Sequence, residues 1–214
     1  MSVKLVSITH PEMSGLTTPE ELISYCARVS NPSNQMNMDS SPKLLSYLIK
    51  HKHWSPFEMV DMTVEIVTRR SIAAQILRHR SFSFQEFSQR YSTATNIQQI
   101  ELRKQAQTNR QSSEDVVLDS TLLKLVENHM ERGKELYDFL IENDVARETA
   151  RDVLPLATET TMYMKGSIRS WIHYLDLRCE NETQLEHRII ANNIKEIFIT
   201  NFPNISEALK WNKQ

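Results

Sequence analysis

The segment from Arg69 to Arg90 holds the densest set of side chains that could do chemistry. It contains five arginines and His79 but a single acid, Glu86, so its formal charge is +4, while the rest of the chain, whose total charge is -2, carries -6. A guanidinium group binds two phosphate oxygens at once and stays charged at any working pH. We therefore expect a focused anion site here; a solvated helix face with ordinary ion pairs is the alternative.

Glycine is scarce, which limits how phosphate could be bound. The chain has three glycines, Gly15, Gly133 and Gly166, and no two of them are close in sequence. The G-x-G-x-x-G turn of dinucleotide-binding folds and the G-x-x-x-x-G-K-[ST] phosphate loop both need clustered glycines, because their backbone N–H groups approach the phosphate. Both motifs are excluded, so side chains must hold any nucleotide phosphate.

Length, charge and hydrophobicity exclude further classes of protein. At 214 residues the chain suits one domain, residues 1–214, that needs no disulfide to hold its core. Acidic and basic residues nearly balance, which argues against a nucleic-acid coat or a membrane-surface protein. No apolar run approaches the roughly 18 residues of a membrane span. The N-terminus lacks a signal peptide's apolar stretch, so we expect a cytosolic protein whose Cys26 and Cys179 are free thiols.

Several helix starts and one strand can be predicted from local patterns. Residues 18–21, Thr-Pro-Glu-Glu, form a capping box and predict a helix. Ser-Pro pairs at Ser41 and Ser55 repeat the signal of a helix start. From Asp61 to Thr68 apolar and polar residues alternate, which predicts a strand half-buried in a sheet.

Apolar residues three and four positions apart predict that most remaining elements are helices. These helices lie at 71–80, 122–140, just before Pro155, and at 167–178, 182–201 and 206–211. The segment from Thr95 to Asp115 is polar and is predicted to be a mobile surface segment. Mostly helical with at least one strand, the chain is predicted to be of the α+β class.

The order Arg78-His79-Arg80, seven residues, then Ser88 resembles the signature of flavin-dependent thymidylate synthases. The fuller family pattern, R-H-R-x-x-S-x-N-E-x-S-x-R-Y, is met from Arg78 to Tyr91 except at Gln85, where the family has asparagine. Glutamine keeps the amide and adds one methylene. Other stretches resemble family landmarks in family order: Ala27–Ser30, His51–Glu58, Arg151 with Leu154–Leu156, and Ser167–Arg178.

This resemblance implies a reaction and an architecture. Enzymes of the family convert dUMP to dTMP, with the carbon taken from methylenetetrahydrofolate and the hydride from NADPH by way of bound FAD, without a covalent enzyme nucleophile. They are homotetramers whose sites combine residues of several subunits, and their α+β fold is mostly helical with a small central antiparallel or mixed sheet. We therefore expect this function in the cytoplasm (the host cytoplasm for a viral protein), with no membrane and no nucleic-acid partner.

The resemblance also implies which residues form the site. Arg178 matches the arginine that activates the pyrimidine, because a fixed cation beside the ring stabilises the anion that makes C5 nucleophilic. The dUMP-binding positions correspond to Gln75, Ile76, Leu77, Arg78, Glu86, Phe87, Ser88, Gln89, Arg90, Arg151 and Arg178, the apolar ones by backbone or shape. The FAD-binding positions correspond to Ser30, His53, Ser55, Arg78, His79, Arg80, Glu86, Ser167, Ile168, Arg169 and His173. Family members commonly have asparagine at the positions of Ser167 and His173, so those contacts differ here.

Some residues permit other chemistry. Ser88 could be a nucleophile if a base lay within hydrogen-bond reach, and Cys179 could be a thiolate beside Arg178. We assign Ser88 to nucleotide binding and Cys179 to packing. The pair His51 and His53 lacks further ligands at a recognisable spacing, so no metal site is predicted.

The residues also leave two other functions open. Arginines next to Phe82, Phe84 and Phe87 could clamp phosphates and stack bases in a nucleic-acid-binding module. The charge of -6 on the rest of the chain would repel a long polyanion, which weakens this alternative. The second alternative is a catalytically silent protein that binds flavin and nucleotide; the intact Glu86, Arg90 and Arg178 argue against it.

Overall fold

A computed structural model describes residues 1–93, 96–110 and 112–211. Its central element is an antiparallel sheet that contains the strand predicted at 61–68. In the described residues the strand order is β1 (Ser2–Ile8), β2 (Asp61–Arg69), β6 (Glu159–Ser167) and β3 (Ser83–Glu86). Strands β2 and β6 pair along their whole length, from Asp61 opposite Ser167 to Arg69 opposite Glu159. The edge strand β3 places the segment after the Arg-His-Arg motif beside β6.

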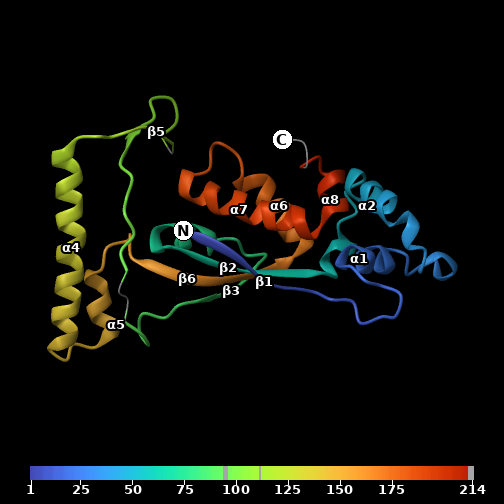
Figure 1. Cartoon of the computed structure of the whole chain (residues 1–214), viewed down its shortest axis with the longest axis horizontal. Helices are drawn as coiled ribbons and strands as arrows, with labels where there is room; N and C mark the ends of the chain where they lie inside the picture. Colours follow the sequence, from blue (N-terminus) through green and yellow to red (C-terminus); the bar gives the residue numbers. More distant parts are fainter. Residues whose placement is uncertain (94–95, 111, 212–214) are drawn as a thin grey trace.

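Helices cover one face of this sheet. Met62, Val64 and Ile66 of β2 are fully buried, and Met162 and Met164 of β6 lie on the same face because they pair directly with this row. Helices α6 (Ile168–Arg178) and α7 (Leu185–Asn201) pack over them (Figure 1). The predicted strand at 61–68 and the helices predicted at 167–178 and 182–201 are therefore confirmed, as is the mostly helical α+β class with a small antiparallel sheet.

Strands β1, β3 and β6 were not predicted from the sequence. Strand β6 does alternate, with Thr160, Met162 and Met164 buried while Tyr163 and Lys165 are exposed. Its buried threonine and its flanking polar residues weaken the apolar signal. The edge strands β1 and β3 keep most of their side chains exposed or half-buried, so burial leaves little pattern in them.

The predicted helix starts are only partly correct. At residues 18–21 the capping box is confirmed: Glu21 N donates to the Thr18 hydroxyl at 3.2 Å, and Thr18 N donates to the Glu21 carboxylate at 2.9 Å. Ser41 is the first residue of helix α2 and not its N-cap, which is Ser40. The Ser41 hydroxyl does not cap the helix because it forms a buried hydrogen bond with the Ser24 hydroxyl. The Ser-Pro sequence at Ser55 begins a 3₁₀ turn and not an α-helix.

The other described helices are α1 (Pro19–Ala27), α2 (Ser41–Lys50), α3 (Arg70–Ile76), α4 (Ser120–Glu142), α5 (Arg147–Ala150) and α8 (Pro203–Ala208). The 3₁₀ turns are η1 (Pro32–Asn34), η2 (Met38–Ser40), η3 (Ser55–Glu58) and η4 (Arg151–Val153). The helix predicted at 71–80 is wrong beyond Ile76, because the chain then turns to bring β3 onto β6. The helix predicted before Pro155 is the short α5 with η4, and the one predicted at 206–211 is α8.

The polar segment predicted to be mobile contains an antiparallel pair, β4 (Arg103–Gln105) and β5 (Ser113–Val116). Arg103 anchors this hairpin to Glu186 of α7 at 2.7 Å. An ion pair with a residue far along the chain gives no local signal, so the hairpin was not predicted. Thr95 and Gln111 of the same segment lie outside the described residues.

Helix α4 stands at one side of the molecule, apart from the layer formed by α6 and α7 (Figure 1). The helix predicted at 122–140 is confirmed, but Tyr137 is its one buried residue. Leu125 and Phe139 are 60% and 59% exposed. Most of its apolar stripe therefore faces solvent in a single chain. Neither α4 nor any other described helix has the length and apolar character needed to cross a membrane.

Gly166 of β6 predicts a measurable packing constraint. A Cβ atom here would collide with the ring of Phe82, which packs 4.7 Å from Trp171 between ring centroids. We expect Gly166→Ala to lower the free energy of unfolding by about 1–3 kcal/mol, because the ring must move within a dense core. Chemical denaturation measures this. The matched control is Gly133→Ala in α4, where the nearest atom, a Pro155 carbon, is 3.1 Å away; an equal loss in both variants would contradict the explanation.

Candidate active site

Arg178 and His79 meet although 99 residues separate them in sequence. The Nε of Arg178, at the end of α6, donates a hydrogen bond to Nε2 of His79 at 2.9 Å. Helix α6 is fixed because Ser167 caps its first turn and Trp171 and Tyr174 are buried in the core. His79 lies in the turn after α3, edge-on to the Tyr174 ring at 4.8 Å between centroids. The predicted catalytic arginine therefore has a fixed direction.

Both histidines near Arg178 are neutral. Burial, and then the charge of Arg178, lower the pKa of His79 to about 4. Burial, Arg178 and His79 together lower the pKa of His187 to about 4. Because Arg178 donates to Nε2 of His79, the proton of this ring must lie on Nδ1. Burial also raises the pKa of Tyr174, whose hydroxyl lies 3.0 Å from Nε2 of His187. Arg178 is thus a cation beside two neutral imidazole rings.

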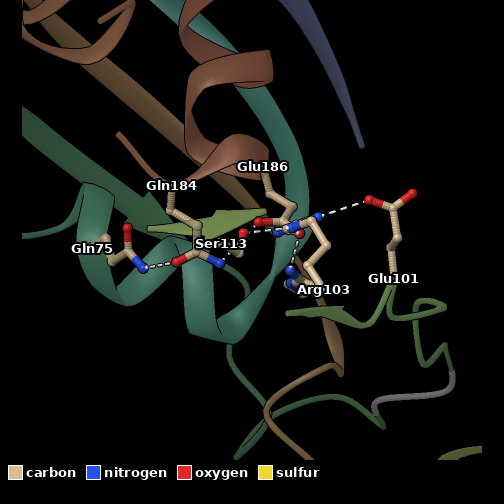
Figure 2. A network of polar contacts seen from close by, with 7 residues as sticks. Gln75, Glu101, Arg103, Ser113, Gln184 and Glu186 are labelled. Carbon is tan, nitrogen blue, oxygen red and sulfur yellow. Dashed lines mark hydrogen bonds and ion pairs between the residues drawn. The ribbon is translucent and has the colours of Figure 1, made fainter. Parts of the chain in front are cut away.

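Gln75 is linked through Gln184 to a buried ion-pair cluster (Figure 2). Its Nε2 donates to Oε1 of Gln184 at 2.7 Å, and Nε2 of Gln184 donates to Glu186 at 2.9 Å. Glu186 also accepts from Arg103 at 2.7 Å and forms an ion pair with Arg69 at 2.7 Å. Glu186 is only 5% exposed, and the two cations offset the cost of its desolvation. Arg69, one of the five clustered arginines, therefore serves the interior.

Glu86 and Phe87 are positioned by β6. The Glu86 carboxylate accepts from the Thr160 hydroxyl at 2.9 Å and lies 3.7 Å from Arg70. The backbone N–H of Phe87 donates to the carbonyl of Thr161 at 2.9 Å and so continues the pairing of β3 with β6. A half-buried carboxylate held in this way can accept from a ligand while staying aligned.

Ser88 and Arg90 line a cleft of about 480 Å³ beside the start of α5. Arg90 forms an exposed ion pair with Glu148 at 3.5 Å, and Nε of Arg151 donates to the Glu148 carbonyl at 3.2 Å. Gln89 is 3% exposed, and its side-chain nitrogen has no hydrogen-bond partner in the described part of the chain. Guanidinium groups around an open cleft suit a phosphate.

Other predicted FAD-binding residues gather around the start of α6. Ser167 is the N-cap residue of this helix, Arg169 forms an ion pair with Glu58 of η3, and the His173 ring lies 5.1 Å from that of Trp54. The turn η3 packs against both α1 and α6. Ser30, after α1, and His53 and Ser55, at η3, are exposed on this side. Arg78 and Arg80 are exposed in the turn that holds His79.

One chain does not bring all predicted residues together. The nine residues of β6 span about 26 Å at 3.3 Å per residue. Glu86 and the residues after it lie toward the Glu159 end of β6, whereas Ser167 and Arg169 lie at the opposite end. Ile76 and Ile168 are fully buried, so they can offer only backbone or shape; Leu77 and Phe87 are 38% and 37% exposed.

Comparisons with known proteins decide the family. A family model described as "Thymidylate synthase complementing protein" matches residues 12–204. The chain is 51% identical to a "Probable flavin-dependent thymidylate synthase" of Paramecium bursaria Chlorella virus 1, over 99% of this chain and 100% of that protein. The chain belongs to the flavin-dependent thymidylate synthase family.

Two further similarities agree with this family. A flavin-dependent thymidylate synthase of Synechocystis sp. is 50% identical over 99% of this chain and 100% of its own length. Among solved structures, a UMP/dUMP methylase, PolB from Streptomyces cacaoi bound with 5-Br dUMP, superposes with a TM-score of 0.81 at 25% identity. The superposition covers 98% of this chain and 94% of that one.

Several residues near the site were not singled out by the sequence analysis. Tyr174, Gln184, Glu186 and His187 were read only as helix residues, and Arg103 as part of a polar segment. Their one signal was the polar sequence Gln-Leu-Glu-His at the start of a helix, which resembles ordinary first-turn chemistry. What distinguishes them is burial and contact with Gln75 and His79, which only the fold reveals.

The alternative chemistries gain no support from the geometry. Burial raises the pKa of Cys179 to about 11, which opposes a thiolate and fits a packing residue, and both cysteines are free. No base is found hydrogen-bonded to Ser88 Oγ in the described residues. In that same part of the chain, no group of three or more His, Cys, Asp or Glu side chains could hold a metal ion.

The neutral histidines predict an acid-sensitive fold. Because the ordinary histidine pKa is 6.5 and the folded value is about 4, the unfolded chain binds more protons between these pH values. Stability should therefore fall as the pH is lowered through this window. In His187→Gln, which can keep contacts to Tyr174 and Gln75, the fall should be shallower, as measured by the denaturation midpoint against pH. Exposed His129→Gln on α4 is the control; the same slope in all three chains would refute the assignment.

Proposed function

We propose that this chain catalyses the reductive methylation of dUMP to dTMP as one domain, residues 1–214. In this proposal methylenetetrahydrofolate supplies the carbon, NADPH supplies the hydride through bound FAD, and no enzyme nucleophile becomes covalently attached. The observation that carries the proposal is the Arg178 cation, fixed by neutral His79 beside the Gln75 network. The two flavin-dependent thymidylate synthase relatives and the similarity to a dUMP methylase structure support it.

Arg178 acts on the pyrimidine ring in this proposal. Uracil C5 becomes a nucleophile when electron density moves into the ring, and a positioned cation stabilises the resulting anion. His79 uses its only free lone pair on the Arg178 Nε–H, so the two terminal nitrogens of the guanidinium keep their N–H groups for the substrate. A protonated His79 could not accept this bond and would repel the arginine.

The phosphate and the rest of dUMP would be held by side chains at the β3 end of the sheet. Ser88 and Arg90 line the open cleft near α5 and suit the phosphate, and Arg151 is bonded to the carbonyl of Glu148, which also lines the cleft. The side-chain nitrogen of buried Gln89, which has no partner in the described residues, can donate a hydrogen bond to a ligand. Gln75, Arg78 and Glu86 complete the set, with backbone contacts from Ile76, Leu77 and Phe87.

The donor set also fits FAD, which would supply hydride transfer when bound. A flavin dinucleotide has a pyrophosphate and flat rings, and the exposed Arg78, Arg80 and Arg169 offer guanidinium groups in place of a glycine-rich loop. The exposed His53 can stack against a flavin or folate ring. The remaining proposed contacts are Ser30, Ser55, His79, Glu86, Ser167, Ile168 and His173.

We infer a homotetramer in which each site combines residues of several subunits. Two observations support this: the dUMP residues Phe87–Arg90 and the FAD residues Ser167 and Arg169 lie toward opposite ends of β6, and α4 exposes an apolar stripe. We place the enzyme in the cytoplasm, or in the host cytoplasm if the chain is viral. A nucleic-acid-binding role is disfavoured, because Arg69 and Arg70 of the basic segment are paired with Glu186 and Glu86.

Arg178→Ala tests the reaction directly. We expect turnover to fall by about 10²–10³-fold or more, because a preorganised charge at the reacting ring is lost, while yellow FAD stays bound. Tritium release from C5-labelled dUMP, with NADPH and methylenetetrahydrofolate each present and absent, measures it. Exposed Arg110→Ala is the control. Near-normal turnover of Arg178→Ala, or a colourless parent protein that cannot be reconstituted with FAD, would contradict the proposal.

Subunit mixing tests the shared site. Arg90→Ala changes the proposed dUMP-binding residues and His53→Ala the proposed FAD-binding residues, so each homotetramer should be nearly inactive. After denaturation and joint refolding, hybrids should regain activity, because some sites then combine an intact Arg90 with an intact His53. Mixing Arg90→Ala with Ser88→Ala, two changes on one segment, should restore none. Failure of the first mixture, with hybrids verified by mass spectrometry, would show that the sites are not shared.

A further inference from the structure

The buried Glu186 carboxylate divides its two oxygens between different partners. Oε1 accepts from Nη2 of Arg103 at 2.7 Å, and Oε2 accepts from Nε2 of Gln184 at 2.9 Å (Figure 2). Oε1 also forms an ion pair with Nη2 of Arg69 at 2.7 Å. Burial raises the pKa of this carboxyl, but the Arg103 hydrogen bond and further contacts outweigh it and hold the pKa below the ordinary value. Glu186 is therefore an anion that can only accept hydrogen bonds.

This anion fixes the direction of every hydrogen bond that follows. Gln184 must turn its NH₂ group to Glu186, which leaves its Oε1 to accept from Gln75 at 2.7 Å. Gln75 must then offer Nε2 to Gln184, which leaves its own Oε1 facing Nδ1 of His187 at 3.4 Å. With its proton on Nδ1, His187 accepts at Nε2 from the Tyr174 hydroxyl at 3.0 Å. We call Glu186, Gln184, Gln75, His187 and Tyr174 the amide relay.

We propose that Glu186 is a positioning residue that acts through Gln184 to set the amide direction of Gln75, so that Gln75 offers a donor to the substrate. This rests on the proposed function, in which Gln75 contacts dUMP. One N–H of the Gln75 amide is used by Gln184, and the second remains for the ligand. A uracil carbonyl oxygen can accept this hydrogen bond. If the Gln75 amide were reversed, its own oxygen would face the uracil oxygen, and no hydrogen bond could form.

The chemistry of the relay predicts that one isosteric change reverses it. In Glu186→Gln, Arg69 and Arg103 would still demand an acceptor, so the new amide would turn its oxygen to them and its NH₂ group to Gln184. Gln184 would then have to flip, and Gln75 after it. The proton of His187 would move from Nδ1 to Nε2, because its neighbour on the Nδ1 side would have become a donor.

A swap of the two side chains should restore the direction. In Glu186→Gln combined with Gln184→Glu, the new amide can still face the arginines with its oxygen and donate to the new carboxylate. That carboxylate accepts from Gln75, as Gln184 Oε1 did. Formal charge is unchanged, but the anion is displaced from the arginines. Rescue would therefore report amide direction and not the ion pair itself.

The experiment measures dUMP binding by calorimetry and KM against kcat in the FAD-loaded enzyme. We expect Glu186→Gln to weaken dUMP binding and raise its KM by about 10- to 100-fold, the effect of one lost bond plus a mismatched oxygen, with kcat changed far less. The swap should return both within about threefold of the parent. Glu101→Gln is the matched control, since Glu101 pairs with Arg103 at 2.9 Å outside the relay.

Independent readouts separate the possible failures. Nitrogen NMR of labelled histidine should show the His187 proton on Nδ1 in the parent and the swap, and on Nε2 in Glu186→Gln. If Glu186→Gln does not fold, Gln184→Met replaces it in the test, because this change breaks the relay but leaves the ion pairs of Glu186. It must then raise the KM for dUMP by the amount expected for Glu186→Gln. Normal dUMP binding in the folded single variants, or no rescue by the swap, overturns the positioning role. A parent that binds no dUMP overturns the proposed function, and this proposal with it.

Discussion

The hydrogen bond from Arg178 to a neutral His79 is the constraint on which the geometry of the proposed site depends. It exists only while His79 is unprotonated, and burial among aromatic rings maintains that state. To bring the two residues together, α6 must begin at the Ser167 cap, and the chain must turn sharply after Ile76. The turn closes because the Phe82 ring packs against Gly166, where no side chain stands in the way. Sheet, helix and turn thus act together to position this one polar contact.

Scarcity of glycine explains the many ion pairs around the site. A glycine-rich loop binds phosphate with uncharged backbone N–H groups and needs no counter-charge. Arginine side chains that replace it carry charge, and an acidic partner can hold them in place while no ligand is bound. Two of the proposed ligand-binding arginines are held in this way, Arg169 by Glu58 and Arg90 by Glu148. The pairs of Arg70 with Glu86, and of Arg69 and Arg103 with Glu186, hold the surrounding fold. Exposed pairs such as Arg90 with Glu148 are weak and can yield to phosphate, whereas the buried pair at Glu186 is permanent.

Sequence patterns could predict the elements whose signals are local. The capping box at residues 18–21, the alternating strand β2 and the apolar helix α6 each carry their own evidence. Strand β6 was missed because threonine and lysine interrupt the apolar alternation of its methionines. Strand β3 was missed because the residues just before it had been predicted to be helical. The family signature gave the arginines and Arg178, but no local pattern could connect Gln184 to Gln75, which are 109 residues apart. Long-range contacts, not residue types, define the amide relay.

Helix α4 has a consequence for how this protein must be handled. A helix gains most of its stability from the apolar face that it buries, yet here Leu125, Phe139 and their neighbours lie in water in a single chain. If other copies cover this stripe, the order of α4 becomes a function of protein concentration, in the way that any association stabilises what it binds. Helical content and catalytic rate would then decline together on dilution, and a dilute assay would understate the enzyme.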